Sequence, residues 1–420
     1  MTILPWFICL LATLFYFYDF MLRVLPSVMV HPLMSAYQVN ATAIGIVSAF
    51  YFYTYTPLQL PAGMIADKYS PRLVLTISCL ICSIGTILFA TTHHFYIACL
   101  ARGMMGVGSA FAFVGALKLA SIWLPENRFA FFAGLTTSVG ILGAVAVDNI
   151  LTTMVYDLGW QHTVYLLGLW GLGLTVLLYV FIRKKPKPET RSYKPKPDKS
   201  WRATFKRFFG LAKNPYIWMN GIIGLVMFLP ITAFASLWGV DFLNRAYDLK
   251  SAEAASAVSL VFIGMAVVSP FTGLISDKLN SRKIPLFIGC MGCFVSGAVL
   301  FYVTHLPFYL LYMMLFLFGA FASPQVLTFA MSKDLSSKFS TGMSTALTNF
   351  IITIGAGIYQ PMIGYALDSQ WNGAKTEYNT PMFSMHDYQF ALSFVLYSFL
   401  VASVFVLLLP NKKRLSKGRQ

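Results

Sequence analysis

Hydrophobic and polar positions alternate along this chain in long blocks. Apolar runs are separated by short polar segments, and a membrane-spanning helix needs roughly 20 apolar residues. The length and continuity of the runs favour helices over the strands of a membrane barrel. Twelve runs qualify, and we expect spanning helices at 5–33, 41–66, 72–91, 95–119, 129–155, 161–182, 215–242, 253–275, 284–304, 307–331, 341–367 and 388–410.

Composition supports the same class of protein. The 420 residues are 57% hydrophobic and only 11% charged, whereas about a quarter of the residues of a soluble domain are charged. Such a chain cannot cover its surface with polar groups, so its surface must face lipid. The sequence therefore predicts an all-α polytopic membrane protein.

The Lys and Arg residues predict its orientation. With both termini in the cytoplasm, inner loops and tail hold 25 of the 31 Lys and Arg, and outer loops hold three. Cytoplasmic loops of membrane proteins carry this excess. We expect a multi-pass protein of the cell inner (plasma) membrane with cytoplasmic N and C termini. Because the net charge of +16 lies in these loops, we expect no nucleic-acid partner.

The longest basic segment lies between the sixth and seventh runs. It holds twelve Lys and Arg and alternates Lys with Pro, which is typical of an extended tether attracted to anionic lipid; a regulatory role is the alternative. The predicted organisation is a first six-helix bundle at 1–182, a linker at 183–213, a second six-helix bundle at 214–410 and a basic cytoplasmic tail at 411–420.

Two segments of the chain repeat one another. "GMIADKYSPR" begins at Gly63 and "GLISDKLNSR" begins at Gly273, an offset of 210, and Cys79 and Cys82 match Cys290 and Cys293 at an offset of 211. Two halves descended from one six-helix unit explain this match. Parallel repeats of this kind are a transporter architecture with the substrate near the midplane.

The repeated loop resembles the signature of the major facilitator superfamily, and the resemblance extends over nearly the whole chain. It implies two six-helix bundles, rocker-switch alternating access, and charge pairs that latch the halves in one conformation. In physical terms, the glycines permit close helix packing, and the aspartates can pair with Arg72, Arg282 or a neighbouring helix end. Plain anchoring by the basic residues is the alternative. The motif residues are Gly63, Asp67, Lys68, Arg72, Gly273, Asp277, Lys278 and Arg282.

Four ionisable residues within the apolar runs are candidates for function: Asp19, Arg23, Arg102 and Asp148. A charge at a helix centre costs at least about 2.5–3.5 kcal/mol. The helical rise places all four in one layer, and the spacing of four puts Asp19 and Arg23 on one face. Either Asp19 and Arg23 neutralise each other and Arg102 ties to Asp148, or a carboxylate titrates while an arginine receives an anionic solute through its planar fork.

Polar and aromatic residues elsewhere in the runs are candidates for lining the solute cavity, although helix–helix packing explains them equally well. They are Tyr16, Tyr51, Tyr55, Gln59, Trp238, Gln325, Asn349 and Gln360. The Cys-x-x-Cys pairs lie within apolar runs without an accompanying histidine, so we expect them to pack rather than to bind metal. No metal or cofactor is expected.

These features predict a monomeric secondary transporter. The expected solute is small, polar and carboxylate-bearing, such as an amino acid, small peptide or organic acid, and it moves by proton-coupled symport. A proton-driven exporter of a siderophore or drug is the first alternative, and a non-transporting receptor or scaffold is the second. An enzyme is not expected, because the chain lacks a metalloprotease spacing, a phosphate-binding loop and a nucleophile elbow.

Overall fold

The computed structural model describes residues 3–182, 210–211, 213–303, 305–336, 341–376 and 379–410. The described part is almost wholly helical. Eleven of its helices are long and apolar enough to span a membrane, and a bent helix pair raises the number to twelve. The predicted all-α polytopic class is therefore confirmed. Most of the predicted linker and the whole predicted tail lie outside the described residues.

Two helical halves follow one another in the chain. The first half consists of α1 (Ile3–Val24), η1 (Leu25–Val28), α2 (Val30–Tyr37), α3 (Ala41–Lys68), α4 (Pro71–Thr91), α5 (Phe95–Ser109), α6 (Ala112–Trp123), α7 (Glu126–Ala146), η2 (Val147–Leu151), α8 (Thr152–Leu158) and α9 (Trp160–Phe181). The second half consists of α11 (Pro215–Leu229), η3 (Pro230–Trp238), α12 (Gly239–Tyr247), α13 (Ser251–Lys278), α14 (Lys283–Tyr302), α15 (Phe308–Ala322), η4 (Ser323–Val326), α16 (Leu327–Leu335), α17 (Thr341–Gln370) and α18 (Met385–Leu408).

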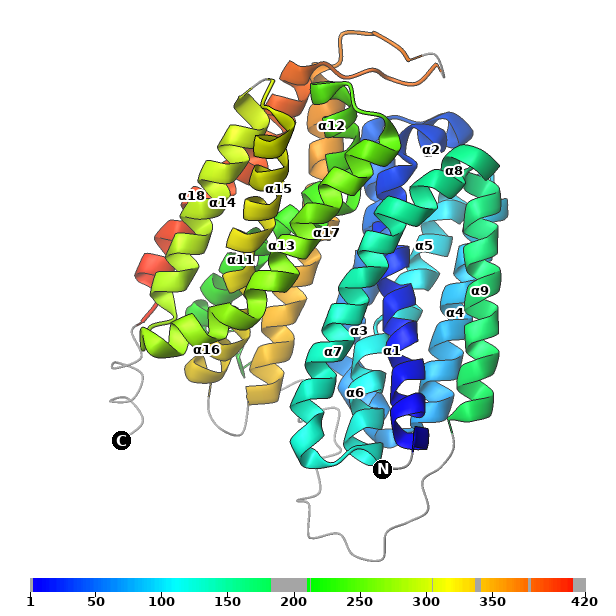
Figure 1. Cartoon of the computed structure of the whole chain (residues 1–420), viewed down its shortest axis with the longest axis vertical. Helices are drawn as coiled ribbons and strands as arrows, with labels where there is room; N and C mark the ends of the chain where they lie inside the picture. Colours follow the sequence, from blue (N-terminus) through cyan, green and yellow to red (C-terminus); the bar gives the residue numbers. More distant parts are fainter. Residues whose placement is uncertain are drawn as a thin grey trace, which may run out of the picture.

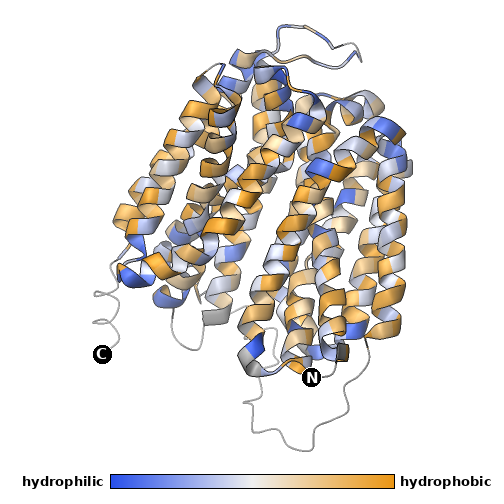
Figure 2. Ribbon diagram, viewed as in Figure 1, coloured by the Kyte–Doolittle hydropathy of each residue, from blue (hydrophilic) through white to orange (hydrophobic). Residues whose placement is uncertain are grey.

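Figure 1 shows the halves side by side with their long helices roughly parallel. The start of α1 and the end of α18 lie at one end, which we call the terminal end. The short helices α2, α8 and α12 lie at the opposite end, which we call the distal end. Hydrophobic positions dominate the helices between the two ends in Figure 2, as expected for segments that cross the apolar core of a bilayer.

The first spanning helix ends earlier than the predicted 5–33. Its last turn is the 3₁₀ segment η1, which contains Pro26, and α2 meets α3 at an angle of 106°. Proline lacks the amide donor that an α-helix interior needs, so the helix tightens there and the chain turns across the distal end. Spans five and seven contain the π segments η2 and η3, a feature frequent at functional sites.

The halves pack most tightly where α3 meets α17. A Cβ added to Gly45 of α3 would lie 2.6 Å from the Gln360 carbonyl oxygen, and one added to Gly364 of α17 would lie 2.5 Å from the Ala41 carbonyl oxygen. Glycine is required at both positions because only hydrogen fits between the two backbones.

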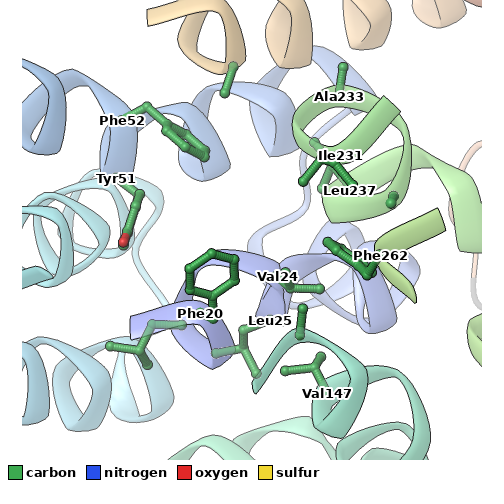
Figure 3. Packing of buried hydrophobic residues seen from close by; sticks show 14 of the residues in the cluster. Phe20, Val24, Leu25, Tyr51, Phe52, Val147, Ile231, Ala233, Leu237 and Phe262 are labelled. Atoms are coloured by element: carbon green, nitrogen blue, oxygen red, sulfur yellow. The ribbon is translucent and has the colours of Figure 1, made fainter. Parts of the chain in front are cut away.

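Apolar side chains fill the adjoining region between the halves. Figure 3 shows Phe20, Val24 and Leu25 of the first half opposite buried side chains of the second half. Those opposing residues are Ile231, Leu237 and Phe262. The contact joins η1 with η3, so the two interrupted helices meet between the halves.

On the other side of the molecule, α13 meets α7, η2 and α8. Ser256 of α13 donates a hydrogen bond of 2.8 Å from its hydroxyl to the Asn149 side-chain oxygen. In Figure 1, α13 and α7 lie close near the distal end and diverge toward the terminal end. The halves are therefore closed against each other at the distal end.

The glycine contact gives a direct stability test. We expect Gly45→Ala to lower the melting temperature of the purified protein, because the new methyl group meets backbone atoms of α17 and overpacking costs about 1–3 kcal/mol. Gly134→Ala is the matched control, since nothing lies within 4 Å of its added Cβ and alanine favours the helix. Equal melting temperatures for the two variants would contradict the tight α3–α17 contact.

Candidate functional site

Five residues of the first half form a buried cluster of charges and rings, which we call the Asp19 cluster: Asp19, Arg23, Tyr51, Tyr55 and Arg102. Arg23 lies one turn after Asp19 on α1, and its Nη2 donates to Asp19 Oδ2 at 3.2 Å. The Tyr51 hydroxyl, from α3, donates to Asp19 Oδ1. Both oxygens of this fully buried carboxylate are therefore hydrogen-bonded.

Aromatic faces surround the Arg23 guanidinium. Its central carbon lies 4.6 Å from the ring centre of Phe20 and 5.0 Å from that of Tyr55. The Tyr51 and Tyr55 rings stack with centres 5.6 Å apart. Ring faces attract a desolvated guanidinium, so Arg23 is held by its charge partner and by stacking.

Arg102 of α5 joins three helices. Its Nη1 donates to the Leu22 carbonyl oxygen of α1 at 2.6 Å, its Nη2 donates to the Ser48 carbonyl oxygen of α3 at 3.5 Å, and its guanidinium lies 5.2 Å from the Tyr51 ring centre. Among the described residues, Arg102 thus bonds to backbone carbonyl oxygens of α1 and α3 in place of Asp148, so the Arg102–Asp148 tie, one of the two alternatives, is not formed.

Asp148 lies in the π segment η2 of span five. Its side chain is fully buried, and neither carboxylate oxygen has a hydrogen-bond partner. The structure thus brings together three of the four predicted charged residues and leaves Asp148 unpaired. An unpaired carboxyl group is stable in such surroundings mainly in its neutral form.

The Asp19 cluster carries unused capacity for an anion. Two arginines and one aspartate give it a net charge of +1 when all three are ionised. The Nε atoms of Arg23 and Arg102 are buried and have no hydrogen-bond partner among the described residues. A planar carboxylate could accept from these unused donors, since guanidinium and carboxylate geometries match.

Five of the eight predicted cavity residues fall into two groups. Tyr51 and Tyr55 belong to the Asp19 cluster, and Tyr16 contacts the rings of Phe20 and Phe113 beside it. Trp238 and Gln360 instead connect η3 with α17. The Trp238 Nε1 donates to the Gln360 carbonyl oxygen at 3.1 Å, and the Gln360 Nε2 donates to the Thr232 carbonyl oxygen at 2.7 Å.

The remaining three candidates lie elsewhere between the helices. Gln325 is buried in η4, whereas Gln59 and Asn349 are half-buried on α3 and α17. The Gln325 and Asn349 backbone carbonyl oxygens accept hydrogen bonds from threonine hydroxyl groups of their own helices.

The predicted gating motif differs in detail from the expectation. No atom of the described residues lies within 4 Å of a Cβ added to Gly63 or Gly273, so the part of the chain that the structure describes does not show the expected close helix packing at these glycines. The Asp277 side chain is exposed, and the Arg282 Nε donates to Asp334 Oδ2 at 2.6 Å. In the second half the arginine of the motif thus pairs with the end of α16 and not with the aspartate of the motif.

The first-half copy of the motif uses its arginine differently. The Arg72 guanidinium lies 4.1 Å from the Tyr179 ring centre of α9. Lys68 lies 5.4 Å from the neighbouring Tyr69 ring centre. The contacts of Arg72 and Lys68 with these rings therefore both lie within the first half.

Sequence reasoning missed a cavity of about 850 Å³ at the distal end. It lies between the halves, and none of the eight predicted cavity residues lines it. His31 of α2 and Asp241 of α12 meet there and are separated in sequence by 210 residues. That separation equals the offset of the repeated loop motif, so the repeat itself carried the signal that these two positions could meet.

Comparison with known proteins agrees with this architecture. The sequence profile described as Major Facilitator Superfamily matches residues 9–358 and 221–419. The chain belongs to the major facilitator superfamily. Its relatives and its fold are those of transporters, not of enzymes. It is a multi-pass membrane transporter of organic solutes.

Two relatives and one solved structure illustrate the similarity. A probable sulfoacetate transporter of Cupriavidus necator is 26% identical over 69% of this chain and 67% of that protein. A probable L-galactonate transporter of Escherichia coli is 25% identical over 60% of this chain and 58% of that protein. A bacterial homologue of the human lysosomal transporter spinster, solved in an inward-facing and occupied conformation, has a TM-score of 0.78 at 15% identity, with 97% of both chains covered.

The buried ion pair can be tested by a double-mutant cycle. We expect Asp19→Asn or Arg23→Gln alone to lower the melting temperature strongly, because removal of one partner of a buried pair costs about 3–5 kcal/mol. The double variant should lose less than the sum of the two single losses, because no charge is left without its partner. Thermal unfolding in detergent measures all four proteins, and strictly additive losses would contradict the pairing.

Proposed function

We propose that this protein is a proton-coupled symporter of small carboxylate-bearing organic solutes. The observation that carries the proposal is the Asp19 cluster, in which a buried Asp–Arg pair lies beside a second arginine and the Nε atoms of both arginines are unused. Burial of a charge within a membrane protein costs free energy, so a buried charge is a candidate for function.

Solute binding and proton binding are linked through Arg23 in this proposal. Arg23 offers its guanidinium to the solute carboxylate, and the Tyr51 and Tyr55 rings form one wall of the site. As the solute takes over the guanidinium, Asp19 loses its counter-charge. A buried carboxyl group without a counter-charge favours its protonated form, so solute and proton bind together.

The names of the relatives support a carboxylate-bearing solute. Sulfoacetate and L-galactonate, the solutes named for the two relatives, both carry a carboxylate. The common chemical feature of these solutes matches the arginine donors of the Asp19 cluster.

The two halves supply the conformational change. We infer that they rock against each other, so that the Asp19 cluster is reached from one side at a time. The excess of Lys and Arg in the loops of the terminal end supports a cytoplasmic location for that end in the inner membrane. The motif residues and the anionic-lipid contact of the linker belong to the same proposal, with the protein acting as a monomer.

Solute class is the first test. In a thermal-shift screen of the purified protein against amino acids, organic acids, sugar acids and neutral sugars, we expect the carboxylate-bearing compounds to raise the melting temperature, because a ligand that binds only the folded state stabilises it. Arg23→Lys should reduce the shift, since lysine keeps the charge but lacks the planar fork. If neutral sugars alone raised the melting temperature, the proposed recognition of a carboxylate would be wrong.

Proton coupling is the second test. For a solute found in that screen, we expect the wild type in proteoliposomes to accumulate it when an inward proton gradient is imposed. Asp19→Asn should abolish gradient-driven accumulation but keep solute exchange, because the amide cannot bind and release a proton. Arg23→Lys should raise the KM roughly ten- to hundredfold, the loss of about 1.5–3 kcal/mol for a hydrogen bond to a charged group.

The control for both variants is Asp157→Asn. Asp157 is exposed on α8 at the distal end, so its loss should leave accumulation unchanged. Full gradient-driven accumulation by Asp19→Asn would refute proton coupling through this residue.

A further inference from the structure

A second group of ionisable side chains connects the two halves at the distal end. The His31 Nε2 lies 2.8 Å from Asp241 Oδ1, and the His31 Nδ1 lies 3.1 Å from the Thr380 hydroxyl. The Tyr388 hydroxyl donates to Asp241 Oδ2. We call these four residues the distal latch. His31 belongs to the first half, and the other three residues belong to three separate segments of the second half.

The distal latch lies where the halves would have to part. It lines the cavity of about 850 Å³ between them, and Figure 1 shows α2 and α12 at that end of the molecule. The His31 side chain is 26% exposed and the Asp241 side chain is 7% exposed. The imidazole is therefore within reach of water, whereas the carboxylate depends on its protein partners.

We propose that His31 is a proton-binding site that closes the distal end of this transporter. A protonated imidazole holds the Asp241 carboxylate of the opposite half, and loss of the proton releases the two halves. The description of this site as a gate rests on the proposed alternating access, and the proton acts here on the conformation and not on solute binding.

The ionisable groups around His31 come from three helices. Asp241 and Arg245 lie on α12, Asp387 and Tyr388 lie on α18, and Tyr156 lies on α8. Asp241 touches the imidazole directly, whereas Arg245 is an exposed side chain one turn further along α12. The charge that His31 meets at close range is therefore negative.

This charge determines the direction of the pH dependence. The Asp241 carboxylate lies 2.8 Å from the His31 imidazole, and an opposite charge at this distance favours the charged form of a histidine. When the halves part, His31 returns toward the ordinary histidine pKa of about 6.5. The closed state therefore holds its proton more tightly. Its extra stability is fully present below the ordinary pKa and is lost as the pH rises through the pKa of the closed state.

Two other described polar contacts between the halves at the distal end do not share this property. One is the Ser256–Asn149 hydrogen bond between two uncharged side chains, and the other is made by Asp368. The Asp368 carboxylate of α17 accepts from the Ala41 and Thr42 amides at 3.1 and 2.8 Å and from the Thr42 hydroxyl. Its partners are neutral amides and a hydroxyl, which keep their protons at every physiological pH. The pH dependence of distal closure thus depends on His31.

Ser27 offers a reporter of distal opening. Its side chain lines the cavity, is 2% exposed and has no hydrogen-bond partner, so Ser27→Cys removes no hydrogen bond. The reference is Lys375→Cys, in an exposed loop of the same end. The ratio of their labelling rates with a membrane-impermeant maleimide cancels the intrinsic pH dependence of the thiol. The six native cysteines are buried, and the protein without either reporter gives the background rate.

We expect the Ser27→Cys to Lys375→Cys ratio to rise several-fold between roughly pH 5.5 and 8.5, a range that brackets the ordinary histidine pKa of about 6.5. The ratio should stay high and constant when His31→Gln or Asp241→Asn is added, because either change removes the ion pair. His162→Gln is the control, since His162 is exposed on α9, and it should keep the full rise.

Three results would overturn the proposal: a wild-type ratio that does not change with pH, a ratio that falls as the pH rises, or an unchanged rise in His31→Gln. If His31→Gln fails to fold, Asp241→Asn tests the same pair, and the wild-type profile is a test without either variant. Labelling needs neither solute nor gradient. A labelling ratio that does not change with pH would therefore contradict the distal latch but not solute transport. A failure of solute uptake would contradict the proposed transport but not the distal latch.

Discussion

Burial of the Asp19–Arg23 pair is the constraint on which the first half depends. Two charges 3.2 Å apart and almost without exposure are tolerated only because each is held by further partners, since an uncompensated charge in an apolar interior costs several kcal/mol. Tyr51 satisfies the carboxylate, and ring faces surround the guanidinium. The placement of α3 and α5 against α1 follows from these contacts.

The second half is held together within the membrane by a different kind of contact. Its central contacts are hydrogen bonds from uncharged groups, such as those between Trp238, Gln360 and Thr232, together with closely packed phenylalanine rings around Phe234. Such contacts carry no charge that a solute or proton could alter. The described central contacts of the two halves thus differ, with the buried Asp19–Arg23 pair in the first half and uncharged hydrogen bonds and ring packing in the second.

The sequence predicted the helices well because the length of an apolar run is a local property. It also identified Asp19, Arg23 and Arg102 as buried charges, since any charge within such a run stands out. It could not predict that Arg102 binds the Leu22 carbonyl oxygen in place of Asp148, because that choice depends on how η1 frees backbone groups at the end of α1. The packing around the motif glycines could not be predicted for a similar reason, because close packing depends on how far the halves diverge at the terminal end.

The repeat explains why a latch formed at the distal end. In two halves related by an axis along the membrane normal, equivalent positions near that axis come close to each other, and His31 and Asp241 are equivalent by the 210-residue offset. Directly after duplication, the two equivalent positions carry the same residue, and two identical charged groups at close range repel each other. Divergence to histidine in one half and aspartate in the other turns that contact into an attraction. Because histidine is the side chain whose ordinary pKa lies closest to neutral pH, the attraction is one that a proton can switch without disturbing the buried pair at Asp19.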